Sequence, residues 1–362
     1  MKKVQLAILL LLTGLIGFTS CKKEDNNPDG TETSGSYPYQ LLSSYQLFKG
    51  NMADLSPADG VLPYDLITPL FTDYAKKARF IYIPEDEKIQ YKDTEVLEFP
   101  KGTILVKNFY YDNDYRDASK GRRIIETRLL IRTDDGWEAF PYIWNAGQTE
   151  AELKVIGGQE SVQWVHTDGS TKNITYLVPD KQQCNRCHSI GSQFTPIGPK
   201  ARNLNRDFNY ADGTKNQLLK MKDLGWLEGM PDINSIGKFA DWKDTSQDLD
   251  ARARAYLDVN CVHCHSANGR ANNSGLFLDI DETNESILGF CKTPVAAGKA
   301  SGGLRHVISP TEPDKSILVF RMESTETGIL MPELGRGLVH KEGVDLIREW
   351  ITKMDASKKC AQ

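Results

Sequence analysis

The pattern Cys-x-x-Cys-His occurs twice in this chain, at residues 184–188 and 261–265. In each copy two thiols lie one helical turn apart, so they can form thioether bonds with the two vinyl groups of one haem. The histidine that follows can bind the iron. The sequence therefore predicts two covalently bound c-type haems. Their attachment points are Cys184, Cys187, Cys261 and Cys264, and their proximal iron ligands are His188 and His265.

A Cys-x-x-Cys pair can also belong to a structural zinc site or to a redox-active dithiol. Structural zinc sites combine two such pairs across a short loop. Here the pairs begin far apart, at Cys184 and Cys261, and each is followed at once by histidine. This arrangement favours haem over zinc.

The second haem iron has a clear candidate for its other axial ligand. Met331 lies in a loop well after the second motif and is followed by proline. Cytochromes c carry a methionine in such a loop, and its soft thioether favours Fe(II) and raises the potential. An isolated methionine is otherwise most often a core residue. We expect Met331 to be the distal ligand of haem 2.

Several side chains compete for the distal position of haem 1. Met230 precedes a proline, as Met331 does, and offers a second thioether. His166, at the end of a predicted strand, would instead give a bis-histidine haem of low potential. If neither binds, the iron keeps an open sixth site.

The second motif is expected in a helical region. Two stripes of residues at helical spacing, one leading into the motif and one near the end of the chain, indicate helices that bracket a haem, as in the class I cytochrome c fold. The stripes are Leu249, Ala253, Tyr256 and Asn260, then Val344, Ile347, Ile351 and Met354. Pro313 is expected to open a short helix between them.

Residues 40–178 show a different pattern. Short runs rich in β-branched and aromatic residues alternate with turn signals, and no long helical periodicity interrupts them. The runs are 79–83, 103–111, 123–132, 137–144, 151–155, 162–166 and 173–178. They predict an all-β domain, and a sandwich in particular.

The first motif begins a few residues after the last of these runs. It is therefore expected on a short turn directly after a strand, with the first haem docked against the β domain. Further on, Thr214 is a plausible N-cap for a helix that Gly225 closes.

The N-terminus predicts export and lipidation. Lys2 and Lys3 precede an apolar run, residues 4–18, that is too short to cross a bilayer. Residues 18–21 resemble a bacterial lipobox, in which cleavage before Cys21 frees that cysteine for lipidation. An ordinary secretory signal with an incidental cysteine is the alternative.

The segment after Cys21 is polar up to residue 38 and predicts a disordered tether. The charged residues 22–27 are either a signal for the cell surface or a solvated part of this tether. We expect an outer-membrane or cell-surface lipoprotein, on the periplasmic or extracellular face.

Seven cysteines are present. Cys21 is assigned to lipid and four others to haem, which leaves Cys291 and Cys360. Because an exported protein meets conditions that permit disulfides, we expect these two to pair. Two free thiols are the alternative.

Charge and length narrow the function classes. The formal net charge of −5 at pH 7 argues against nucleic-acid binding, which needs a basic face to neutralise phosphates. The 362 residues exceed what one core usually serves. The predicted parts are a signal peptide (1–20), the lipidated cysteine and tether (21–38), a β-rich domain (39–180), a first haem segment (181–243) and a cytochrome c-like domain (244–362).

The mature chain resembles a family of bacterial dihaem c-type cytochromes. The resemblance rests on residues 99–103, 196–205, 252–261, 274–276 and 331–335. It implies electron transfer with two haems, and it implies no dedicated substrate.

These observations predict a membrane-anchored electron carrier outside the cytoplasm, whose partners are membrane-associated redox proteins or a soluble cytochrome. A dihaem peroxidase is the alternative if one iron is open, and it would need a distal proton shuttle such as Glu228. A third reading is a binding module, in which the β domain recognises a partner and the haems only relay electrons.

Overall fold

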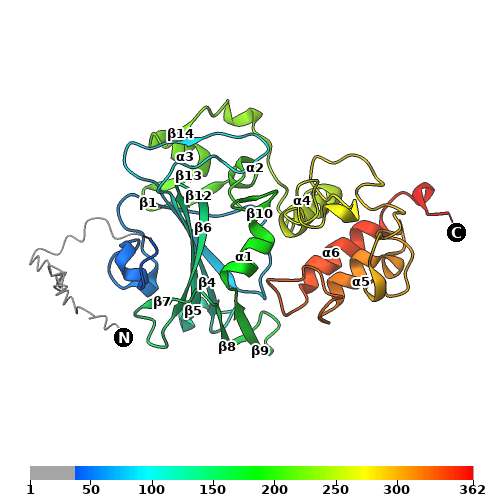
Figure 1. The fold of residues 1–362 in the computed structure, drawn as a ribbon, viewed down its shortest axis with the longest axis horizontal. Coiled ribbons are helices and arrows are strands. Elements are labelled where there is room, and N and C mark those ends of the chain that lie inside the picture. The colour runs from blue at the N-terminus through cyan, green and yellow to red at the C-terminus, as the bar shows by residue number, and fades with distance from the viewer. Residues whose placement is uncertain (1–36, 362) are drawn as a thin grey trace, which may run out of the picture. The chain divides into compact units, whose positions relative to one another are not determined.

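The computed structural model describes residues 37–361 (Figure 1). The signal peptide, Cys21 and most of the tether lie outside the described residues. From Pro38 onward the chain forms one compact unit. Within residues 37–361, no helix has both the length and the apolar character that crossing a membrane requires.

A six-stranded antiparallel sheet dominates the first half of the chain (Figure 1). Its strands contain the runs of β-branched and aromatic residues that favour extended backbone. In spatial order they are β1 (Val61–Tyr64), β2 (Lys76–Tyr82), β4 (Ile104–Asp112), β5 (Arg122–Thr133), β6 (Gly136–Trp144) and β7 (Ala151–Leu153).

One face of this sheet packs against the start of the described chain. Side chains at alternate positions, such as Phe80, Val106 and Leu129, point to this face and are almost fully buried. Leu42 and Leu47, from the segment before β1, cover them. This face of the sheet is therefore mostly apolar, with Asn108 and Thr127 as a buried polar pair within it.

The opposite face carries a separate hairpin at one end. β8 (Gly158–Val165) and β9 (Thr171–Val178) pair antiparallel, and their Trp164 and Tyr176 pack against Phe109 and Tyr111 of β4. Each of the seven runs predicted as strands thus overlaps a strand, with ends shifted by a few residues. The prediction missed β1 and the short strands described next.

At its other end the same face shares a core with residues 201–236. This segment contains α2 (Ala201–Leu204), the hairpin of β12 (Asp207–Tyr210) and β13 (Gly213–Asn216), α3 (Gln217–Asp223) and β14 (Leu227–Glu228). β14 pairs parallel with β3 (Ile89–Gln90), and a further small hairpin, β10 (Ser189–Ile190) and β11 (Gln193–Phe194), precedes the segment. The predicted first haem segment is therefore packed onto the sheet.

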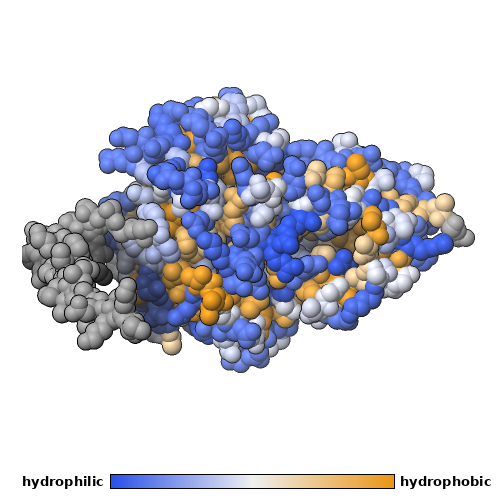
Figure 2. All heavy atoms as spheres, viewed as in Figure 1, coloured by the Kyte–Doolittle hydropathy of each residue, from blue (hydrophilic) through white to orange (hydrophobic). Residues whose placement is uncertain are grey.

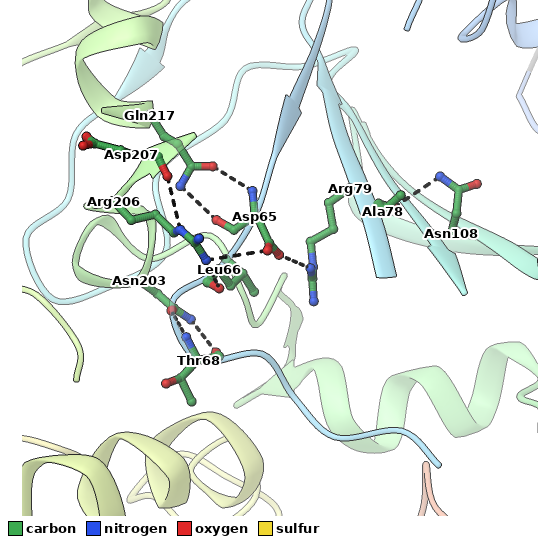
Figure 3. Close-up of polar contacts among 10 residues, drawn as sticks. All are labelled: Asp65, Leu66, Thr68, Ala78, Arg79, Asn108, Asn203, Arg206, Asp207 and Gln217. Atoms are coloured by element: carbon green, nitrogen blue, oxygen red, sulfur yellow. Dashed lines mark hydrogen bonds and ion pairs between the residues drawn. The ribbon is translucent and has the colours of Figure 1, made fainter. Parts of the chain in front are cut away.

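Buried polar side chains fasten this segment to the chain after β1 (Figure 3). The Gln217 amide donates to the carbonyl oxygen of Asp65 at 2.9 Å and accepts from its N–H at 2.7 Å. Asn203 makes the equivalent pair of bonds with Thr68, at 3.1 and 3.0 Å. Each amide replaces the backbone partners that a buried loop would otherwise lack.

The predicted N-cap of α3 was wrong. Thr214 lies in β13, where it pairs with Asn209. The cap is Asn216, whose side chain accepts from the N–H groups of Leu218 and Leu219. The hairpin carries the chain to Asn216, so the helix starts later than the sequence suggested. Gly225 follows the helix with a positive φ of 71°, as predicted for its closing residue.

The second half is richer in helices, so the described chain is mixed α/β. α4 (Leu249–Cys261), α5 (Ile317–Glu323) and α6 (Lys341–Thr352) pack their apolar faces into one core. Pro313 opens a short 3-10 turn directly before α5. Cys291 and Cys360 form a disulfide, in agreement with the predicted pairing.

The surface of the molecule differs from its hydrophobic cores. The face shown in Figure 2 is mostly hydrophilic, with apolar residues in small groups.

Candidate functional site: a cavity between two cysteine motifs

The first motif lies in a short helix, α1 (Lys181–His188), rather than on the turn expected from the sequence. A capping box explains the difference. The Asp180 carboxylate accepts from the N–H of Gln183 at 2.7 Å, and the Gln183 amide accepts from the N–H of Asp180 at 3.1 Å. The Lys181 ammonium also lies 2.6 Å from Glu138 of β6, which fixes the helix over the sheet.

The second motif begins at the last residue of α4, as predicted. The Asp248 carboxylate caps the helix start by accepting from the N–H of Ala251 at 2.9 Å. The chain then turns tightly, because the N–H of His265 donates to the carbonyl oxygen of Cys261 at 2.9 Å. Leu278 donates to the His265 carbonyl at 2.9 Å and holds the turn against the following loop.

One cavity of about 730 Å³ receives both motifs. This volume is within the range of binding sites for large organic ligands. The residues predicted to bind haem that line it are Cys184, Cys187, His188, Cys261, Cys264, His265 and Met331. The fold thus gathers at one place side chains from three separate parts of the sequence.

The two motifs also touch each other. The Cys187 thiol donates a hydrogen bond to the Cys264 sulfur, which raises the pKa of Cys187 to about 12 and lowers that of Cys264. The Cys264 thiol lies 3.8 Å from the carbonyl oxygen of Arg186, as a donor to it. Arg186 in turn lies 3.6 Å from Glu333, on the loop that carries Met331. None of the four motif cysteines is in a disulfide.

His188 is held in the tautomer that a metal ligand needs. Its Nδ1 lies 2.9 Å from the carbonyl oxygen of Thr195, which can only accept, so Nδ1 carries the proton and Nε2 keeps its lone pair. The Phe194 ring is stacked on the imidazole at 4.9 Å between centroids. Burial lowers the pKa of His188 to about 3, so the ring is neutral near pH 7.

His265 is in a similar state. Burial lowers its pKa to about 4, and a hydrogen bond to the backbone of Leu276 acts in the opposite direction. The Ser274 hydroxyl lies 3.5 Å from Nδ1. Both histidines can therefore present a neutral imidazole to a metal.

Met331 lies in a loop that is clamped to the end of α5. Its N–H donates to the carbonyl oxygen of Arg321 at 3.0 Å, and its own carbonyl accepts from Arg336 Nη2 at 2.7 Å. Arg336 also donates to the Met322 carbonyl at 3.1 Å. These bonds fix the backbone from which the Met331 thioether enters the cavity. The peptide bond between Met331 and Pro332 is cis.

The structure does not bring the distal candidates for haem 1 to the cavity. Met230 packs, partly buried, against the core shared by the sheet and residues 201–236. His166 accepts from the Trp164 indole at 3.3 Å and contacts the Tyr74 ring at 4.8 Å. Neither lines the cavity. Glu228, considered as a proton shuttle, is exposed and lies 2.5 Å from Lys88.

Sequence reasoning missed the basic character of the cavity. Although the whole chain is acidic, Asp73 and Glu333 are the only residues of the described range 37–361 that contribute carboxylates to the lining. The basic lining residues are Arg79, Lys107, Arg128, Arg186, Arg270, Arg321 and Arg336. The sequence did contain a signal for it. Arg79, Lys107 and Arg128 stand next to Phe80, Val106 and Leu129 along predicted strands, so they point to the opposite face of the sheet.

The chain matches no family model, and neither the curated proteins nor the solved structures gave a significant match to it. Among residues 37–361, no three His, Cys, Asp or Glu side chains are grouped so as to hold a metal ion. A structural zinc site would need four such ligands around one point.

Proposed function

We propose that this chain is a dihaem c-type cytochrome that transfers electrons outside the cytoplasm. The observation that carries the proposal is the meeting of both Cys-x-x-Cys-His motifs in one cavity, with the Cys264 thiol 3.8 Å from the carbonyl oxygen of Arg186 in the first motif. A shared structural zinc would also bring two such pairs together, but among residues 37–361 no three His, Cys, Asp or Glu side chains are grouped so as to hold a metal ion.

The residues present fit two haems. Cys184 and Cys187 would hold one through thioether bonds, and Cys261 and Cys264 the other. His188 and His265 are neutral, and His188 presents Nε2 by donating from Nδ1. The surplus of basic side chains suits the carboxylates of two haems. When bound, haem iron supplies one-electron redox chemistry, and the protein orients it and sets its electrostatic surroundings.

The contact between the motifs indicates transfer between the two groups. Each haem would be bonded to the sulfur atoms of its own motif, and the Cys264 thiol lies 3.8 Å from the carbonyl oxygen of Arg186, the neighbour of Cys187, so the edges of the two groups would be close. Electron tunnelling falls steeply with distance between edges. A chain with this contact would pass an electron from one haem to the other before either exchanges with a partner.

The proposal also assigns a fold to each half of the described chain. α4, α5, α6 and the Met331 loop would form a class I cytochrome c-like domain, with Met331 as the distal ligand of haem 2. The sheet and the β8–β9 hairpin would form a sandwich-like domain. The resemblance to bacterial dihaem c-type cytochromes and the lipid anchor at Cys21 are proposed with them.

An electron carrier is favoured over a peroxidase. Peroxide reduction needs an acid or base poised over an open iron. Both carboxylates of the cavity are engaged, and so is His340, whose Nδ1 lies 2.9 Å from the Tyr256 hydroxyl. This leaves His263, inside the second motif, as the lining side chain that a peroxidase would have to use. Asp73 accepts from the N–H groups of Gly337 and Leu338, at 2.7 Å each. Glu333 faces Arg186. The partners would be redox proteins, either membrane-associated or small soluble cytochromes.

The test is a pair of reactions of the fully reduced holoprotein. Fast electron exchange with an external cytochrome, together with slow oxidation by hydrogen peroxide, would support the carrier. Rapid and saturable peroxide reduction would instead assign the protein to the peroxidases. A holoprotein that reacts with neither would favour the binding-module alternative.

A further inference from the structure

Three basic residues lie opposite one another on neighbouring strands of the six-stranded sheet. Arg79 of β2 pairs in register with Lys107 of β4, and Lys107 pairs with Arg128 of β5. All three line the cavity. We refer to Arg79, Lys107 and Arg128 as the cationic row.

The row lies between two hydrophobic cores of the same face. Two positions along each strand on the same face, Ile81, Leu105 and Leu130 form the next row and pack into the core shared with residues 201–236. On the other side of the row, Phe109 belongs to the core under the β8–β9 hairpin. The middle of this face, which neither core covers, is the part that meets the cavity.

Like charges directly opposite one another destabilise a sheet unless anions balance them. Arg79 is balanced by Asp65 at 2.6 Å (Figure 3). Arg128 donates from Nε to Glu126 at 2.9 Å, although that carboxylate also accepts from the Tyr176 hydroxyl at 2.6 Å.

Lys107, in the centre of the row, has no such partner. Among the described residues it forms no ion pair, and its ammonium lies 4.8 Å from the centre of the Phe109 ring. Burial, and then the positive charge of Arg79, lower the pKa of Lys107 well below its usual value. A half-buried ammonium without an anion is unfavourable, so the row lacks a negative charge at its centre.

The row faces the first motif. Arg79, Lys107 and Arg128 line the same cavity as Cys184, Cys187 and His188 of that motif. The ion pair between Lys181 and Glu138 holds α1 over the same sheet. A group bound at Cys184 and Cys187 would therefore lie against the row.

On the basis of the proposed function, we propose that the cationic row binds the propionate carboxylates of haem 1. These carboxylates would supply the negative charge that Lys107 lacks, and an arginine beside it can bind a carboxylate through two parallel hydrogen bonds. The site would orient haem 1 and set its potential.

The experiment is Lys107→Gln in the full-length holoprotein, which removes the charge and keeps a polar side chain of similar reach. We expect both haems to stay attached and the spin state to stay unchanged. The midpoint potential of one haem should fall, because a carboxylate that is no longer balanced stabilises Fe(III). Lys107→Arg should retain the original potential. Lys77→Gln, on the same face of β2 but outside the cavity lining, is the control: it removes the same charge without removing a contact to the carboxylate, so its effect on the potential should be clearly smaller.

Infrared difference spectra between the oxidised and reduced forms, recorded with isotopically labelled haem carboxylates, test the contact itself. Bands that shift with the label should change in Lys107→Gln and not in Lys77→Gln. Unchanged labelled bands would overturn the proposal. A high-spin haem in Lys107→Gln would also overturn it, because Lys107 would then be an iron ligand. A wild-type potential that varies with added acetate would overturn it as well, because the row would then bind an anion from solution. Absence of covalent haem from the wild type would refute the proposed function instead.

Discussion

The two cysteine motifs have the same five-residue pattern but stand on different supports. The second ends a helix of 13 residues, α4, inside a helical core that also provides the loop of Met331. The first occupies a helix of eight residues, α1, that leans on a β-sheet. The surroundings of the second motif thus come largely from residues near it in the sequence. The surroundings of the first motif come in part from strands far away in the sequence.

This difference determines which ligands are local. Met331 reaches the cavity from the loop between α5 and α6, within the same region as His265. No methionine of the segment that follows His188 lines the cavity. The first site instead faces Arg79, Lys107 and Arg128. A thioether at one iron and a wall of positive charge beside the other would give the two haems different electronic surroundings.

The largest expected effect comes from removing one attachment site at a time. The double variant Cys184→Ala and Cys187→Ala should lose one haem, because no thioether can form there, while the second haem stays attached. Intact mass and haem staining of denaturing gels would measure this. Cys261→Ala with Cys264→Ala is the mirror experiment. A variant that kept two haem masses would contradict the assignment.

Met331→Ala should change only the second site. The iron of haem 2 would lose its thioether and become high-spin, and its potential should fall because Fe(II) is no longer favoured. Optical spectra and potentiometric titration would measure both. Met322→Leu is a matched control, since Met322 also lines the cavity but is buried in the helical core. If Met322→Leu gave the high-spin signal and Met331→Ala did not, the ligand would be Met322.

The elements around the second motif could be predicted well because their determinants are local. α4, its exit into Cys261 and the Met331 loop follow from spacing along the chain. The first site could not, because its walls depend on which strands pair. Sequence gives no distance between Lys107 and His188, so Met230 and His166 remained candidates although the fold places them elsewhere. The helix α1 was missed even though Asp180 and Gln183 carry a capping-box pattern, because the strand before it suggested a turn.

Both cysteines of the disulfide lie in the helical region that contains α4, α5 and α6. Loss of the disulfide should lower the stability of that region. Cys291 and Cys360 enclose a sequence separation of 69 residues. The chain-entropy model gives a stabilisation of about 4 kcal/mol for a loop of this size. The double variant Cys291→Ser and Cys360→Ser should lower the thermal midpoint of the holoprotein and leave the spectrum of haem 1 unchanged. An unaltered midpoint would show that the bridge does not constrain the unfolded chain.

The smallest expected effect tests the support of the first motif. Asp180→Ala removes one half of the capping box of α1, a change that usually costs about 1 kcal/mol. Since α1 is short and carries all of the first motif, fraying at its start should loosen haem 1 and leave haem 2 as it was. Hydrogen exchange of residues 181–188 should speed up, while that of α4 should not change.

Asp180→Asn is the matched control, because asparagine caps helices about as well as aspartate and should restore protection. The reciprocal variant, Asp248→Ala, removes the cap of α4. It should have less effect on the second motif, because α4 is longer and its motif lies at the end remote from the cap. If the two variants increased hydrogen exchange of their motifs equally, α1 and α4 would be equivalent supports. The two sites would then differ only in the side chains that line them.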